Sequence, residues 1–60
     1  MADETVSEVA ELYLGNILYA LELAAVSLEA EGKHDHAAYY RGIARMLAEA
    51  HGREKGGAAS

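Results

Sequence analysis

The chain contains no cysteine, proline, tryptophan or phenylalanine. Without cysteine it can form neither a disulfide nor a thiolate metal site, so two common ways of stabilising a small domain are excluded. Without proline, no residue forbids a long α-helix, and the abundance of Ala, Leu and Glu favours one. The four tyrosines are the only aromatic residues. Tyrosine suits partly exposed sites, because its ring packs against apolar groups while its hydroxyl hydrogen-bonds to water or a polar partner.

Basic residues are absent from the first half of the chain. Residues 1–31 contain seven acids and no lysine or arginine, whereas residues 32–60 contain five bases and three acids. The halves therefore carry −7 and +2, which gives the net charge of −5, and Gly32 lies between them. This division predicts two unlike helices joined by a tight turn. The acidic residues 1–5 do not resemble the basic start of a secretory signal, and we expect a cytoplasmic protein.

Capping signals set the expected boundaries. Thr5 and Glu8 have the spacing of a capping box at a helix start. Gly32 can take the left-handed position that ends a helix, Asp35 can cap the next helix, and Gly52 can end it. The sequence thus predicts an acidic lead (1–4), a helix (5–31), a turn (32–34), a second helix (35–51) and a disordered tail (52–60).

Each expected helix has distinct faces at 100° per residue. The first has a broad apolar side, a second apolar flank and a narrow glutamate stripe formed by Glu4, Glu8, Glu11, Glu22 and Glu29. The second has one apolar stripe and a polar side that holds Arg41 and Arg45. The residues expected in the core or in a dimer contact are Val6, Val9, Tyr13, Ile17, Leu21, Ala24, Leu28, Tyr39, Ile43, Met46, Leu47 and Ala50.

The two helices differ in length. The first would extend roughly 39 Å and the second roughly 24 Å, so an antiparallel partner reaches back only to about Asn16. The uncovered start can be covered by a second copy or by a different protein, or the helix can break at Gly15-Asn16 and form a three-helix mini-bundle. We expect the first solution. The predicted fold is an all-α antiparallel helical hairpin that self-associates into a homodimeric four-helix bundle.

The sequence offers little for catalysis. It shows no nucleophile–base pair, phosphate loop or carboxylate pocket, so we expect no enzyme and no cofactor. The segment His34-Asp35-His36 lacks typical metal-ligand spacing, and no metal site is expected. Leu12–Leu28 is largely apolar but holds Glu22 and has no basic flank, which argues against a membrane span.

Direct nucleic-acid binding is not expected either, because the bases are few and the first helix is acidic. In length, hairpin and short turn the layout is similar to the small homodimeric RNA-binding helical hairpins that control plasmid copy number. The basic RNA-contacting face of those proteins is absent here. The resemblance therefore covers architecture alone and does not carry their function.

The function predicted from these patterns is a non-enzymatic protein–protein interaction module: an adaptor, assembly factor or inhibitor. An acidic inhibitor that imitates nucleic acid at a partner's basic site, of a type that phages use, is the alternative. A histidine-based metal or pH sensor at residues 34–36 is a further one. The residues expected to bind a partner are the apolar flank and adjacent glutamates: Leu12, Tyr19, Leu23, Val26, Glu8, Glu11, Glu22 and Glu29.

Overall fold

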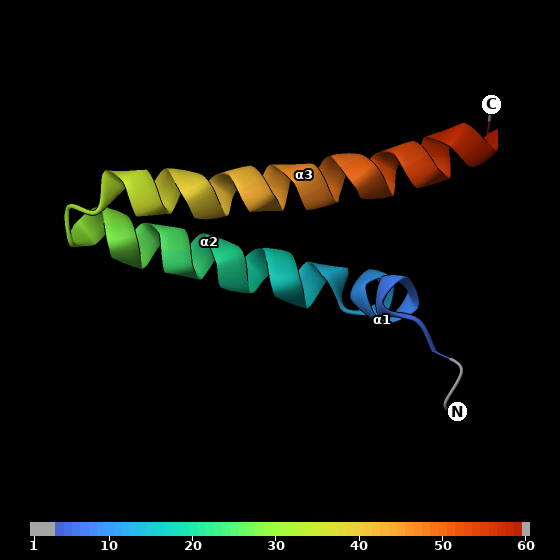
Figure 1. Ribbon diagram of the computed structural model, residues 1–60, viewed down its shortest axis with the longest axis horizontal. Helices are drawn as coiled ribbons and strands as arrows, with labels where there is room; N and C mark the ends of the chain where they lie inside the picture. The colour runs from blue at the N-terminus through green and yellow to red at the C-terminus, as the bar shows by residue number, and fades with distance from the viewer. Residues whose placement is uncertain (1–3, 60) are drawn as a thin grey trace.

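The protein is described by a computed structural model that covers residues 4–59, with side chains described for residues 4–53. Its elements are α1 (Val6–Leu12), α2 (Leu14–Ala30) and α3 (His34–Ala59). Helices α2 and α3 run antiparallel from a short turn, and α1 is seen nearly end-on at the open end of this hairpin (Figure 1). The predicted all-α class is confirmed. The described residues contain helices and turns but no strand.

The first helix begins as its capping signal predicts. The Glu8 backbone N–H donates to Thr5 Oγ1 at 3.1 Å, and the Thr5 backbone N–H donates to Glu8 Oε1 at 3.1 Å. This reciprocal pair satisfies two backbone donors that a helix start otherwise leaves to water. Of the expected acidic lead (1–4), Glu4 is described and non-helical, while residues 1–3 lie outside the described residues.

A single helix over residues 5–31 was the wrong expectation, because the helix breaks at Tyr13. This residue has φ −106° and ψ 19°, and α1 and α2 meet there at a bend of 75°. The break falls two residues before Gly15-Asn16. The bend places Val6 and Ala10 of α1 beside Leu47 of α3 around one concave surface. Ala10 is half-buried there, whereas Val6 stays 86% exposed, so the apolar area that the bend covers is small.

The turn between α2 and α3 has the predicted glycine ending. Gly32 has φ +80°, a conformation that glycine adopts without a steric penalty. The Gly32 N–H donates to the Glu29 carbonyl at 2.9 Å, and the Lys33 N–H donates to the Leu28 carbonyl at 2.8 Å. These two bonds form a Schellman motif, which ends α2 and reverses the chain within a few residues.

The second long helix continues beyond its expected end. We predicted a stop at His51 and a disordered tail over 52–60, but α3 runs through Gly52 to Ala59, and Ser60 lies outside the described residues. A glycine costs an α-helix only about 1 kcal/mol. Arg53, Glu54 and Lys55 then favour helix by their intrinsic propensity, so Gly52 alone does not impose a stop.

Only small residues are fully buried in the hairpin. Ala25 of α2 and Ala37 of α3 are both 0% exposed, and no larger side chain among those described is fully buried. The expected core is therefore only partly formed within one chain. Its half-buried members are Ile17, Leu21, Ala24, Leu28, Ile43 and Leu47. Its exposed members are Val6, Val9, Tyr13, Tyr39, Met46 and Ala50.

The orientation of α3 accounts for this difference. The side of α3 that is buried or half-buried includes Ala37, Arg41 and Ala44, spaced four and three residues apart. At 100° per residue, Tyr39 and Met46 lie about 140–180° around α3 from these three residues, nearly on its opposite side, and remain 67% and 64% exposed. Small residues at the contact allow close helix approach, but they leave the larger apolar side chains outside it.

Candidate interaction surfaces and the Arg41 network

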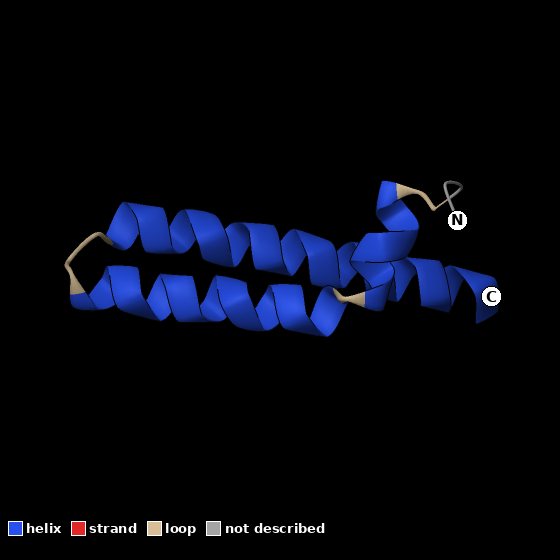
Figure 2. Ribbon diagram, turned by 90° about the horizontal axis from the view of Figure 1, so that it is seen from below, coloured by secondary structure: helices blue, strands red, loops and turns tan. Residues whose placement is uncertain are grey.

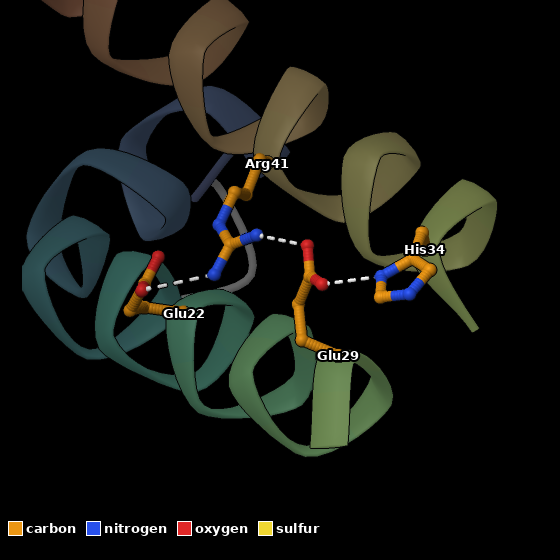
Figure 3. A network of polar contacts seen from close by, with 4 residues as sticks. All are labelled: Glu22, Glu29, His34 and Arg41. Carbon is orange, nitrogen blue, oxygen red and sulfur yellow. Dashed lines mark hydrogen bonds and ion pairs between the residues drawn. The ribbon is translucent and has the colours of Figure 1, made fainter. Parts of the chain in front are cut away.

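A network of polar side chains joins α2 and α3 along one edge of the hairpin (Figure 3). Arg41 Nη1 donates to Glu29 Oε2 at 2.9 Å, and Arg41 Nη2 lies 3.6 Å from Glu22 Oε2. On the other side of the Glu29 carboxylate, Oε1 lies 2.5 Å from His34 Nδ1. One arginine from α3 therefore bridges two carboxylates that are two helical turns apart on α2.

The environment of Glu29 favours its charged form. Hydrogen bonding with His34 lowers the pKa of the Glu29 carboxyl below its ordinary value of 4.5, and the hydrogen bond from Arg41 lowers this pKa further. Partial desolvation opposes these two effects. The Glu29 side chain is 38% exposed, so solvent screens its interactions to a considerable extent.

The predicted glutamate stripe is thus engaged within the chain. Glu22 and Glu29 lie beside Arg41, Glu8 closes the capping box, and Glu11 Oε2 lies 4.0 Å from His51 Nδ1. Glu11 and Glu22 nevertheless keep 51% and 59% of their side-chain surface exposed. Glu22 and Glu29 lie along an edge of the contact between α2 and α3, whereas Glu8 and Glu11 lie on α1, on the other side of the 75° bend.

Sequence reasoning missed the role of Arg41, because its position next to Arg45 on the wheel suggested a solvent-facing side. A signal was present. Arg41 lies four residues after Ala37 and three before Ala44, so it shares the face of these two small residues. An arginine on the face that packs against an acidic helix is well placed to bridge carboxylates.

The predicted apolar flank is exposed, but the bend divides it. Tyr19, Leu23 and Val26 lie on one side of α2, spaced four and three residues apart, and are 68%, 53% and 50% exposed. Leu12 is 71% exposed at the end of α1, on the other side of the 75° bend. We call Tyr19, Leu23 and Val26 the outer face of α2, because they lie away from its contact with α3.

The histidines near the turn are not grouped as a metal site. His34 points toward Glu29 (Figure 3), and His36 lies farther along α3 beside Tyr39 and Tyr40. Within residues 4–53, no three histidine, aspartate or glutamate side chains are placed to hold one metal ion.

Among the described helices, none is by itself both long and apolar enough to cross a bilayer. Only α1 and α2 taken together reach the necessary length and hydropathy, and they are bent by 75°.

Comparisons with known proteins found no matching family model, no similar curated protein and no similar solved structure.

Proposed function

We propose that the chain is a small non-enzymatic protein–protein interaction module, which binds another protein through the outer face of α2 and self-associates into a homodimeric four-helix bundle. The observation that supports partner binding is the exposure of Tyr19, Leu23 and Val26 together on one helix side, each at 50% or more. Clustered apolar side chains at helical spacing are typical of a helix–helix contact.

The chemistry of this face suits a protein partner. A tyrosine beside branched aliphatic residues offers a large apolar area and one polar hydroxyl, and tyrosine is enriched at binding hot spots. Leu23 is 53% exposed, so covering it contributes roughly 1 kcal/mol, about half of the value for fully burying a leucine. Glu22 borders the face and is 59% exposed, so a partner with a basic residue at the rim would meet a complementary charge.

The self-association part of the proposal is supported by the exposed area. The chain exposes 4717 Å², whereas a compact protein of its size exposes about 3,800 Å². The excess of about 900 Å² is close to the roughly 800 Å² that each partner covers in a standard protein interface. Among the residues whose side chains are described, only Ala25 and Ala37 are fully buried, and no large side chain is fully buried within a single copy.

The test of partner binding compares two aspartate variants of equal charge. Leu23→Asp alters the outer face, and Ala38→Asp introduces the same charge on an exposed position of α3. The immobilised wild-type chain and both variants are incubated with cell extract, and captured proteins are quantified by mass spectrometry. We expect proteins that bind the wild type and Ala38→Asp but are lost with Leu23→Asp. Equal capture by all three chains would contradict the proposal.

The alternative is an acidic inhibitor that occupies a basic nucleic-acid-binding site. The observation that favours it is the excess of charge in residues 1–31, where seven acids occur without a base, while Glu11 and Glu22 stay more than half exposed. Such binding should weaken steeply as salt is raised. It should also disappear when Glu11, Glu22 and Glu29 are all changed to Lys. Salt-independent binding would exclude this mechanism.

The histidine sensor remains a prediction for residues 34–36, which form the start of α3. Its metal form is tested by calorimetric titration of the chain with zinc or nickel, and the absence of heat would rule it out. Its pH form rests on the contact of His34 with Glu29, which is an ion pair only when His34 is protonated.

A further inference from the structure

A second apolar face lies on the side of the hairpin toward which α1 bends. At its open end, Val6, Val9 and Ala10 of α1 and Ile17 of α2 line a concave surface. Figure 2 shows α1 running across the hairpin rather than along it. Because the bend turns α1 out of the line of α2, α1 forms a wall at one end of this face.

The same face continues toward the turn. Ala24 and Leu28 of α2, together with Tyr39 of α3, line a second concave surface. Met46 is seven residues after Tyr39, so the two side chains lie within 20° of each other around α3. Both are about two-thirds exposed. We call this surface the clasp face; its residues are Val6, Val9, Ile17, Ala24, Tyr39 and Met46.

The clasp face is separate from the polar network. At 100° per residue, Ala24 lies 160° around α2 from Glu22, so the carboxylate bridged by Arg41 is on the far flank. None of the six residues of the clasp face is charged. Glu4 and His36 also line the two concave surfaces of this face, one on each. Charge is therefore sparse there, and two copies of such a face can meet with little like-charge repulsion, although each chain carries −5.

The dimensions of α1 also fit one docked helix. Its seven residues extend about 10 Å, which equals the usual distance between the axes of packed helices. No residue of α1 is buried within its own chain. A wall of this height is therefore suited to cover one helix of a neighbouring molecule laid against the clasp face.

We infer that a second copy of this chain occupies the clasp face about a two-fold axis, and that α1 of each copy closes over the other. This inference rests on the proposed self-association and names the surface that carries it. Four helices, α2 and α3 from each copy, then form the bundle, with one α1 at each end. The outer face of α2 stays free for another protein.

The first experiment is sedimentation equilibrium of the full chain and two glutamate variants over a wide concentration range. Met46→Glu places a charge on the clasp face, and Leu23→Glu places it on the outer face of α2. Met46 is already 64% exposed, so its replacement leaves the contact between α2 and α3 intact. We expect the wild type and Leu23→Glu to be dimers and Met46→Glu to dissociate at least about 100-fold more readily.

Two results would overturn the inference. One is a wild-type chain that stays monomeric throughout the range, and the other is a dimer that Leu23→Glu disrupts and Met46→Glu does not. Circular dichroism of each variant verifies that its helices remain. If the wild type is a monomer and Leu23→Asp abolishes partner capture, the clasp-face dimer is refuted and the partner-binding function is supported. If the wild type dimerises through the clasp face and Leu23→Asp leaves the captured proteins unchanged, the dimer is supported and the partner-binding function is refuted.

A second measurement isolates α1. The chain has no cysteine, so Val6→Cys or Tyr19→Cys carries a single thiol for an environment-sensitive fluorophore. We expect the dye at position 6 to shift to shorter wavelength as the dimer forms on concentration, because α1 then covers the other copy. The dye at position 19 should not shift. If the emission wavelength of the dye at position 6 did not change as the dimer formed, α1 would not close over the second copy.

Discussion

Arg41 and Glu29 are twelve residues apart in the chain and are joined by a hydrogen bond of 2.9 Å between α3 and α2. The Arg41 side chain is 39% exposed, so it is partly screened and partly within the helix contact. Because the same guanidinium also lies near Glu22, its removal leaves two carboxylates without their shared cation.

We expect Arg41→Ala to lower the free energy of unfolding by about 1 kcal/mol, toward the upper end for partly exposed ion pairs. Arg45→Ala is the matched control, since Arg45 is exposed and its loss should change stability by less than about 0.5 kcal/mol. Urea unfolding followed by circular dichroism measures both. Added salt should reduce the difference between the two variants in their free energy of unfolding. Equal stabilities would mean that the network does not hold the hairpin together.

The lowered pKa of Glu29 makes stability depend on pH in acid. A carboxyl whose folded pKa lies below its ordinary value of 4.5 adds stability above that value, and this contribution is lost as the pH falls through the lowered pKa. We expect the melting temperature to fall below pH 4.5 and Glu29→Gln to reduce this fall. Glu31→Gln serves as a control, because the Glu31 carboxylate pairs with the exposed Lys33 at 3.4 Å and both side chains are more than half exposed. If the melting temperatures of Glu29→Gln and Glu31→Gln depended on pH in the same way, the lowered pKa of Glu29 would be contradicted.

Replacing Gly32 or Gly15 by alanine should change the stability of the chain in opposite directions. Gly32 has φ +80°, where a side chain is strained, so Gly32→Ala should destabilise the hairpin by about 1–2 kcal/mol. Gly15 lies within α2, and an added Cβ there meets nothing within 4 Å. Gly15→Ala should stabilise the chain by about 0.5–1 kcal/mol. Thermal melts of both variants test the pair, and a stabilising Gly32→Ala would contradict the turn geometry.

The smallest core residues should be the least tolerant of enlargement. Ala25 is 0% exposed, so Ala25→Leu must push α2 and α3 apart and should cost about 1–3 kcal/mol. Ala30→Leu adds the same side chain at an exposed position of the same helix. Its effect on the chemical denaturation midpoint should be small. A neutral Ala25→Leu would show that the helices are not closely packed there.

Local signals in the sequence predicted the capping box at Thr5 and Glu8 and the left-handed Gly32. Both depend on side chains or backbone freedom within a few residues, which a sequence displays directly. The bend at Tyr13 was not predictable in this way. No proline or glycine occupies that position, and the bend brings α1 beside Leu47, which is distant in sequence.

The orientation of α3 was missed for a related reason. A helical wheel shows the apolar stripe through Tyr39 and Met46, but it cannot show whether the first partner is α2 or another molecule. The structure assigns Ala37 and Ala44 to the side nearest α2, where small side chains permit close approach. The partner-binding residues Tyr19, Leu23 and Val26 are exposed as expected, and their use stays a prediction.

The turn at Gly32 has a consequence for the order in which the chain folds. Its two backbone hydrogen bonds and the buried Ala25 and Ala37 lie at the closed end, where few residues separate the contacting segments. Contacts between near neighbours form with little loss of chain entropy, so pairing should begin at this end and proceed toward α1. Native-state hydrogen exchange should then show the slowest amides on either side of the turn and the fastest in α1, where opening costs least.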